Sequence, residues 1–295
     1  MNLIKPKKLQ EGDTIKIIAP SGYIEYEKIL NAKKYFELQG YRVKVGKNIQ
    51  KKLRYMSGSD EERLADLHEA FLDKDVNAVL CARGGYGAIR LLNKINYGLI
   101  EANPKIFCGY SDITALSAMI FKRTGLITFS GPMVKSDFQT ESIDNFTVSN
   151  FWNTLKSNII QITPMRKNPS EFKFSGILIG GNLATFASLS GLDFIPNESF
   201  MFFAEDLNEP IYKIDRYFTQ LFNIKEFKEN VKVIILGEFL DIEDTEQLTE
   251  LFNEIEKEHN IPVIGYYPIS HGKKKVTVPY GGTATLKNGL LTVEY

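Results

Sequence analysis

The sequence predicts an α/β protein whose first half carries a parallel β-sheet and whose second half adds a further region of strands and helices. Strand and helix patterns alternate along residues 14–122, which is typical of a parallel sheet covered by helices on both faces. A polar stretch with two prolines, residues 158–174, then interrupts these patterns. With 295 residues and 43% hydrophobic side chains, the chain is long enough for one large domain or two of ordinary size.

In the first half, each predicted element follows from a local pattern. Apolar runs predict strands at residues 14–18, 41–45, 76–81 and 106–110, and helical spacing predicts helices at 26–38, 88–95 and 113–122. Gly40 is typical of the residue just beyond a helix end. Ser59 and Glu62 have the spacing of a capping box, so a further helix is expected to begin there.

The second half continues the alternation and ends in short strands. Its patterns predict strands at residues 201–204, 231–236 and 263–267 and helices at 212–222 and 246–258. We therefore expect an N-terminal domain over residues 1–157, a linker over 158–174 and a C-terminal domain over 175–295.

Composition excludes several classes of function. Lys plus Arg and Asp plus Glu are both 36, so the formal net charge is zero and no nucleic-acid partner is indicated. Cys81 and Cys108 each end a strand pattern, which favours buried small side chains over a disulfide or a metal site. No apolar signal segment and no membrane-spanning run are visible, so we expect a cytoplasmic protein without a membrane partner.

One predicted strand-to-helix turn carries a serine. Residues 109–112 read Gly-Tyr-Ser-Asp, and such a turn holds the Ser111 hydroxyl out of the sheet. The N–H groups and positive dipole end of the following helix point at the same place. This is the arrangement of a nucleophile elbow, although Ile113 replaces the usual glycine. Ser111 or Asp112 would serve equally well as an ordinary helix N-cap.

A glycine-rich loop, residues 83–87 with the sequence Arg-Gly-Gly-Tyr-Gly, follows another predicted strand. Glycines let the backbone turn tightly and bring bare N–H groups close to a ligand. The loop therefore suits an oxyanion hole or a phosphate site, and the turn geometry alone would also explain it. Ser21, Arg83 and Ser111 all fall at the carboxyl ends of predicted parallel strands, where ligands bind.

Among the three histidines, His271 is the best candidate for a base. His68 lies on the outer face of a predicted helix, and His259 ends a helix, where a histidine interacts favourably with the dipole. His271 lies in a loop after a predicted strand. By elimination, it is the residue that would take a proton from a serine near neutral pH.

Carboxylates follow the apolar run of residues 201–204. Glu205 or Asp206 could orient an imidazole, as the acid of a Ser-His-acid triad does. A helix cap or a salt bridge would explain both residues as well, and Glu238 is a rival for the same role.

Seven short motifs lie in order along nearly the whole chain. They are Ile18-Ala19-Pro20-Ser21-Gly22, Arg83-Gly84-Gly85-Tyr86-Gly87, Gly109-Tyr110-Ser111-Asp112, Thr128-Phe129-Ser130-Gly131-Pro132-Met133, Gly180-Gly181-Asn182-Leu183, Glu205-Asp206 with Tyr212 to Arg216, and Val276-Thr277-Val278-Pro279. At this order and spacing the chain resembles the LD-carboxypeptidases, a family of serine peptidases of the Ser-Glu-His type.

The resemblance implies a role for each candidate. Ser111 would be the nucleophile, His271 the general base and Glu205 the residue that orients the base. The backbone N–H groups of Gly85 and Asp112 would form the oxyanion hole. No metal and no other cofactor is implied.

The resemblance also implies a fold and a reaction. It implies a flavodoxin-like N-terminal domain, a smaller β-rich C-terminal domain and a homodimer. The implied reaction releases terminal D-alanine from murein tetrapeptide in the cytoplasm, during recycling of cell-wall peptidoglycan. A divergent branch of the family instead hydrolyses peptidyl-nucleotide antibiotics and confers self-immunity. A non-catalytic peptide-binding protein is a further alternative.

The carboxylate of such a substrate needs a cationic partner. Arg83 or Arg216 could supply it through a bidentate contact, although either arginine could also be structural.

Overall fold

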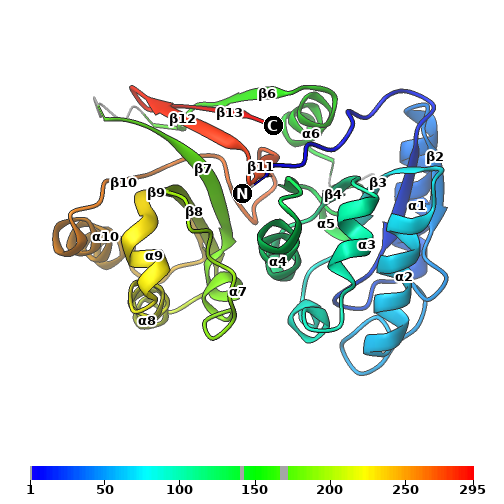
Figure 1. Cartoon of the computed structure of the whole chain (residues 1–295), viewed down its shortest axis with the longest axis horizontal. Coiled ribbons are helices and arrows are strands. Elements are labelled where there is room, and N and C mark those ends of the chain that lie inside the picture. Colours follow the sequence, from blue (N-terminus) through cyan, green and yellow to red (C-terminus); the bar gives the residue numbers. More distant parts are fainter. Residues whose placement is uncertain (1, 140–142, 167–171) are drawn as a thin grey trace.

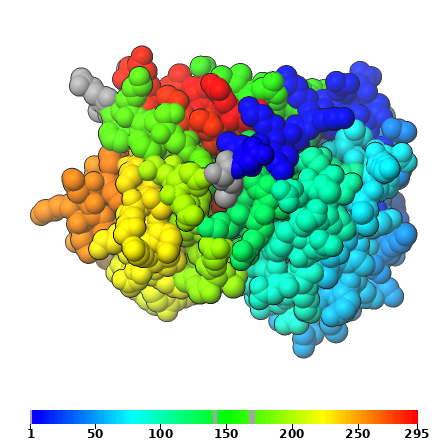
Figure 2. Space-filling model, in the orientation of Figure 1, coloured from blue at the N-terminus to red at the C-terminus, as the bar shows by residue number. Residues whose placement is uncertain are grey.

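The computed structural model describes residues 2–139, 143–166 and 172–295. It contains two β-sheets, each with its own helices, and the predicted α/β class is confirmed. In Figure 1 the first half of the chain, blue to green, lies on the right and the second half on the left. Figure 2 shows atoms of the two halves packed against each other on this face. Their buried apolar side chains form one connected core.

The first sheet has six strands in the order β11-β5-β4-β3-β1-β2. Their bounds are β1 (Thr14–Ile18), β2 (Arg42–Val45), β3 (Val76–Cys81), β4 (Ile106–Cys108), β5 (Thr128–Ser130) and β11 (Val278–Tyr280). All pairs are parallel except β11 with β5. Without β11 the order is 2-1-3-4-5, which is flavodoxin-like, as expected.

The helices of the first half cover both faces of this sheet. They are α1 (Tyr26–Leu38), α2 (Asp60–Leu72), α3 (Tyr97–Ala102), α4 (Thr114–Thr124), α5 (Val134–Asp137) and α6 (Asn145–Lys156). Helix α1 contacts α5, whereas α2, α3 and α4 contact one another in sequence, so the two groups lie on opposite faces. The capping box of Ser59 and Glu62 at the start of α2 is confirmed.

One predicted helix is wrong in this half. Residues 88–95 form only a short 3-10 turn, Ala88–Leu91, followed by a separate helix α3. Asn96 begins α3 by accepting a hydrogen bond from the Leu99 N–H. This cap begins the next helix only after residue 96, so the predicted segment itself contains no α-helix.

The second sheet has seven strands in the order β10-β9-β8-β7-β12-β13-β6. Their bounds are β6 (Ile159–Ile162), β7 (Lys173–Asn182), β8 (Phe200–Leu207), β9 (Val231–Leu240), β10 (Val263–Ile264), β12 (Thr283–Lys287) and β13 (Leu290–Glu294). Strands β7 to β10 are parallel, and β12, β13 and β6 pair antiparallel. The accompanying helices are α7 (Leu183–Ala187), α8 (Ile211–Phe222), α9 (Lys225–Asn230) and α10 (Thr245–His259).

The predicted domain boundaries do not coincide with the two sheets. Residues 159–162, inside the predicted linker, form β6 and pair with β13. Residues 167–171 of that linker lie outside the described residues. Strand β11, from the predicted C-terminal domain, completes the first sheet beside β5. The two halves are thus joined by strand pairing as well as by packing.

The Gly-Gly-Asn motif at the end of β7 brings the second half against the start of α4. A Cβ on Gly181 would lie 2.6 Å from Thr114 Oγ1, and a Cβ on Gly180 would lie 1.8 Å from the Phe203 carbonyl oxygen. Only glycine fits at either place. The backbone N–H of Asn182 donates to Thr114 Oγ1 at 3.2 Å. The end of β7 is thereby held against Thr114, which lies three residues after Ser111 in the sequence.

No helix in the described ranges is long and apolar enough to cross a membrane.

Candidate active site

Ser111 occupies a strained turn between β4 and α4. Its φ is 62°, in the left-handed region that side chains other than glycine rarely adopt. Such a conformation costs about 1–3 kcal/mol and persists only where the surroundings impose it. The side chain is half-buried, and among the described residues its Oγ has no hydrogen-bond partner. This is the elbow geometry that the sequence predicts, and it leaves the hydroxyl available.

The Asp112 carboxylate ties together the loops around this turn. Its Oδ2 accepts from Ser21 Oγ at 2.5 Å and from the Ala88 N–H at 2.9 Å. Ser21 follows β1, and Ala88 follows the glycine loop. Burial raises the pKa of this carboxyl group above its ordinary value. The side chain of Asp112 is therefore occupied in structural contacts, and its backbone N–H is the group left for the predicted oxyanion hole.

The glycine loop lies directly against the serine. A Cβ on Gly84 would come within 2.7 Å of Ser111 Cβ and 3.3 Å of the Asp112 nitrogen. Gly85 has a φ of +102°. In the described part of the chain, neither the Gly85 N–H nor the Asp112 N–H donates a hydrogen bond to protein. Two free donors beside a free hydroxyl are what an oxyanion hole requires.

A fully buried arginine, Arg63, holds the glycine loop through hydrogen bonds. Arg63 Nη1 donates to the Pro20 carbonyl at 2.6 Å and to the Gly87 carbonyl at 2.8 Å. Its Nη2 donates to Asp60 Oδ1 at 2.6 Å, which compensates the buried charge. Arg63 therefore fixes the glycine loop relative to the turn that carries Ser21.

His271 and Glu205 form a close pair. His271 Nδ1 lies 2.5 Å from Glu205 Oε2, and the two side chains are 14% and 4% exposed. Burial lowers the pKa of His271, but the hydrogen bond and the charge of Glu205, with the charge of Asp206, outweigh it. The pKa of His271 therefore lies above 6.5. With Nδ1 held by a carboxylate, Nε2 is the nitrogen left to accept a proton.

The imidazole of His271 contacts Tyr110, the residue directly before Ser111. The two rings meet edge to face, with centroids 4.9 Å apart and planes at 73°. In the described chain no hydrogen bond joins Ser111 Oγ to His271. Catalytic hydrogen bonds often form only when substrate is bound, so the lack of this one does not exclude proton transfer between the two side chains.

The other two candidate carboxylates, Asp206 and Glu238, do not bind the imidazole of His271 within the described residues. Asp206 is buried and accepts from Asn182 Nδ2 at 2.7 Å, from the Ala184 N–H at 2.9 Å and from the Leu207 N–H at 2.9 Å. Burial raises the pKa of Asp206 to about 6. Glu238 lies on β9, and among the described residues its carboxylate makes no hydrogen bond to His271. The carboxylate at the imidazole is Glu205.

The two candidate arginines lie in different places. Arg83 packs against Gly22 and Gly85, and its Nη1 donates to the Tyr23 carbonyl at 2.8 Å. The nearby Lys135 has its pKa lowered, first by burial and then by the charge of Arg83. Arg216 is exposed on α8, over the ring of Tyr217. The Arg83 side chain thus stays beside the loop to which it belongs, whereas the Arg216 side chain packs on its own helix.

The remaining histidines and the cysteines lie outside this cluster. His68 is half-buried, not fully solvated as expected, because its Nε2 accepts from the Asn96 N–H at 3.0 Å. His259 ends α10 and stacks on Phe222 at 3.5 Å. Both cysteines are buried, which raises their pKa. Across the described ranges, no three His, Cys, Asp or Glu side chains are placed to hold a metal ion.

Sequence reasoning missed two residues near the site, Lys275 and Asp137. Lys275 is the last of three consecutive lysines after His271-Gly272, a run typical of an exposed turn, yet it is buried. Asp137 is buried at the end of α5 and forms an ion pair with it. No local signal distinguishes the third lysine from the first two, because its burial depends on a partner 138 residues away.

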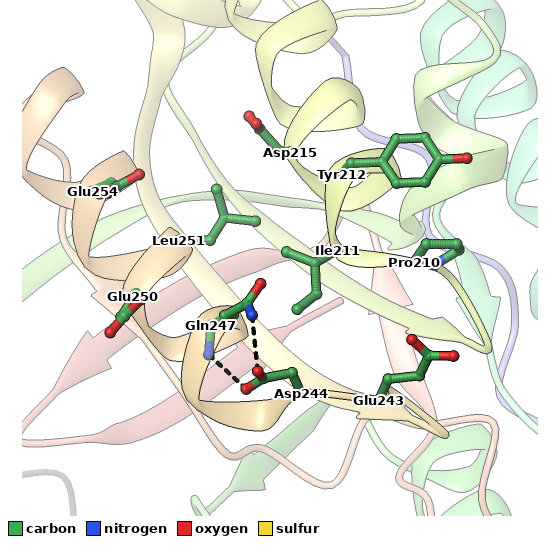
Figure 3. A pocket seen from close by; sticks show the side chains of 10 residues that line it. All are labelled: Pro210, Ile211, Tyr212, Asp215, Glu243, Asp244, Gln247, Glu250, Leu251 and Glu254. Carbon is green, nitrogen blue, oxygen red and sulfur yellow. Dashed lines mark hydrogen bonds between the residues drawn. The ribbon is translucent and has the colours of Figure 1, made fainter.

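A separate pocket of about 820 Å³ lies between α8 and α10. Figure 3 shows Tyr212 and Asp215 on one side of it and Glu250 and Glu254 on the other, with Ile211 and Leu251 between. None of the predicted catalytic residues lines this pocket. The chemistry indicated by the Ser111 turn is therefore located elsewhere.

Comparison with known proteins agrees with the geometry. The LD-carboxypeptidase N-terminal domain matches residues 15–131, and the LD-carboxypeptidase C-terminal domain matches residues 175–286. A Bacillus subtilis (strain 168) protein named "Probable murein peptide carboxypeptidase" is 33% identical over 290 residues, covering 96% of this chain and 91% of the relative.

Two solved structures have the same fold over almost their whole length. Muramoyltetrapeptide carboxypeptidase from Oxalobacter formigenes has a TM-score of 0.88 at 29% identity, covering 96% of this chain and 99% of that one. An MccF-like protein from Bacillus anthracis has a TM-score of 0.90 at 32% identity, covering 99% of both chains. The resemblance inferred from the seven motifs is confirmed: the chain belongs to the LD-carboxypeptidase family.

Proposed function

We propose that this protein is a metal-independent serine LD-carboxypeptidase that releases terminal D-alanine from murein tetrapeptide. The observation that carries the proposal is the His271–Glu205 pair, packed on Tyr110 beside a strained Ser111 whose hydroxyl has no partner among the described residues. The names of the Bacillus and Oxalobacter relatives support the substrate.

The proposed reaction begins with acylation. Ser111 Oγ attacks the scissile carbonyl carbon while its proton passes to His271 Nε2, and Glu205 stabilises the resulting imidazolium. The carbonyl oxygen, now an oxyanion, accepts from the Gly85 and Asp112 N–H groups. The C–N bond then breaks, and the proton on His271 goes to the leaving amine of D-alanine.

Deacylation repeats the sequence with water. His271 takes a proton from water, the hydroxide attacks the acyl carbon, and the C–O bond to Ser111 breaks as the proton returns to Oγ. The same two N–H groups stabilise the second oxyanion. All groups needed for both halves of the reaction come from this chain.

Exopeptidase specificity needs a partner for the terminal carboxylate of the substrate. Arg83 is the stronger of the two predicted candidates because its guanidinium lies beside Gly85. Lys135 adds a second positive charge close to it. A cation next to the oxyanion site would favour peptides that end one residue after the scissile bond.

A direct assay tests this function. The protein is incubated with L-Ala-γ-D-Glu-meso-diaminopimelate-D-Ala, with the lysine analogue, and with the C-terminal amide of each. We expect release of free D-alanine from at least one acid and much slower cleavage of its amide. Absence of D-alanine release from both acids would refute the proposal.

A second candidate is hydrolysis of peptidyl-nucleotide antibiotics, favoured by the similarity to the MccF-like protein of Bacillus anthracis. It would use the same serine and base. A parallel assay with an aminoacyl sulfamoyl adenosine distinguishes the two. A non-catalytic peptide-binding protein would bind the tetrapeptide and leave both substrates intact.

We also propose that the protein acts in the cytoplasm, in peptidoglycan recycling, as a homodimer. The proposal rests on the family to which the chain belongs. Light scattering behind size-exclusion chromatography tests the dimer, since one chain has a mass of 33.5 kDa.

A further inference from the structure

A buried ion pair joins the loop of His271 to the first half of the molecule. Lys275 Nζ contacts Asp137 Oδ1, and the two side chains are only 3% and 4% exposed. Lys275 lies four residues after His271, whereas Asp137 ends α5. Burying two charges removes them from water at a large cost, so such a pair is weak evidence for stability alone.

The same ammonium group also touches the residue before the nucleophile. Lys275 Nζ lies 3.3 Å from Tyr110 Oη and 4.5 Å from the centre of the Tyr110 ring. That ring is the one that meets the imidazole of His271. Tyr110 is thus held by the lysine and in turn supports the base.

Further contacts fix the backbone of this loop on the first half. Thr147 Oγ1 donates to the Lys273 carbonyl at 2.6 Å and accepts from the Lys275 N–H at 2.9 Å. Asp137 is itself held, since its Oδ2 accepts from the Met133 N–H at 2.9 Å. The loop of His271 is therefore anchored at the Lys275 end by the half that carries Ser111.

We propose that Lys275 is a positioning residue for the reaction: its ion pair with Asp137 and its contact with Tyr110 hold the loop of His271 against the nucleophile turn. The inference rests on the proposed peptidase function. Glu205 orients the imidazole from the second half, and Lys275 places the same imidazole relative to the first half. A purely structural pair would stabilise the fold without this effect.

The charge of Lys275 has a second consequence for the base. The charged or titratable groups that face His271 and its loop are Glu205 and Asp206 from β8, Glu238 beside Gly272, Tyr110, and Lys275 with its partner Asp137. Burial and the positive charge of Lys275 lower the pKa of His271, and Glu205 and Asp206 raise it. Loss of the lysine charge therefore raises this pKa further, so less imidazole is free to act as a base.

The test uses a variant in which no buried charge is left alone. Lys275→Met by itself would strand Asp137, so Lys275→Met is combined with Asp137→Asn, which removes both charges and nearly preserves volume. The asparagine amide oxygen can still accept from the Met133 N–H. The matched control is Lys16→Met with Glu69→Gln, because Lys16 is also 3% exposed and its Nζ lies 2.6 Å from Glu69 Oε2.

Steady-state release of D-alanine is the first measurement. We expect kcat of the Lys275/Asp137 double variant to fall on the order of 10²-fold, as for a small misplacement of a catalytic group, with a much smaller change in KM. The acidic limb of kcat/KM should shift from its wild-type midpoint, because the variant removes the positive charge of Lys275 and the negative charge of Asp137 near the imidazole. The control pair should change neither quantity. A double variant with kcat within about threefold of wild type and an unmoved limb would overturn the proposal.

The second measurement needs no substrate. Imidazole NMR signals of the three histidines are titrated, and the signal missing in His271→Ala identifies His271. A pKa of His271 in the Lys275/Asp137 variant that differs from wild type in either direction supports the proposal, and an equal pKa contradicts it. Suppose that wild type releases no D-alanine while the pKa of His271 still differs between wild type and the Lys275/Asp137 variant. In that case the proposed substrate is wrong, and the role of Lys275 in positioning His271 stands.

Discussion

The imidazole of His271 packs edge-on against the ring of Tyr110, with ring centres 4.9 Å apart. Tyr110 directly precedes Ser111 at the end of β4, and His271 lies in the loop between β10 and β11. One contact thus connects the proposed base, which comes from the second half, with the turn of the proposed nucleophile. Because Glu205 holds the other edge of the imidazole, its orientation depends on both halves being folded together.

Replacing the proposed nucleophile should abolish hydrolysis without unfolding the protein. Ser111→Ala removes only an Oγ that has no partner among the described residues, so thermal stability should change little. We expect kcat to fall on the order of 10⁶-fold, as when a triad serine is removed. The measurement is D-alanine release over long incubations. Activity within about tenfold of wild type would exclude the serine mechanism.

Replacing the acid should be damaging but less severe. Glu205→Gln keeps the shape of the side chain, yet its amide favours the wrong imidazole tautomer, a loss of roughly 10⁴-fold in kcat in the trypsin triad. Glu238→Gln is the matched control, since Glu238 occupies the neighbouring strand. The assignment fails if the Glu238 variant loses activity and the Glu205 variant does not.

Ser21→Ala should weaken both stability and catalysis. The substitution removes the Ser21 hydroxyl from the buried Asp112 carboxylate, which keeps its contacts to the backbone at Gly87 and Ala88, a loss of about 1–3 kcal/mol in free energy of unfolding. Because the Asp112 N–H belongs to the proposed oxyanion hole, kcat should fall as well. Urea unfolding and D-alanine release measure the two effects.

A buried serine on α4 gives the control for Ser21. Ser117 is 2% exposed, and its Oγ has no hydrogen-bond partner in the described chain. Ser117→Ala should therefore leave both the unfolding midpoint and kcat close to wild type. Equal effects of the two substitutions would show that the Ser21–Asp112 contact has no special role.

Chelation should leave activity unchanged. In the described residues no group of His, Cys, Asp and Glu side chains is arranged to bind a metal ion, and the proposed chemistry uses N–H groups for the oxyanion. The check is kcat/KM after dialysis against EDTA. Loss of activity that zinc restores would replace the metal-free mechanism with a metal-assisted one.

Much of the fold and site follows from local pattern. Strand β1 and helix α1 begin and end where the sequence predicts, because apolar spacing, a turn after Ile18 and Gly40 define them locally. The Ser111 turn is recognisable because an apolar strand, a small polar residue and a helix follow one another directly.

What the sequence could not show depends on distant partners. The strand Ile159–Ile162 has only four residues inside a stretch that is polar as a whole, and pairing with β13 makes it a strand. Asp206 and Glu205 look equivalent in the sequence, and only the approach of the loop of His271 from 66 residues away distinguishes them. The burial of Lys275 likewise depends on Asp137.

The dependence of kcat/KM on pH tests the central claim, that His271 is the base for Ser111. Glu205 and Asp206 raise the pKa of His271 above 6.5 against the opposing effect of burial, so protonation on lowering the pH removes the base. We expect an acidic limb with its midpoint above pH 6.5 in wild type, kept in His68→Ala and His259→Ala. In His271→Ala both the activity and the limb should be lost. Near-normal kcat/KM with the same acidic limb in His271→Ala would contradict the triad.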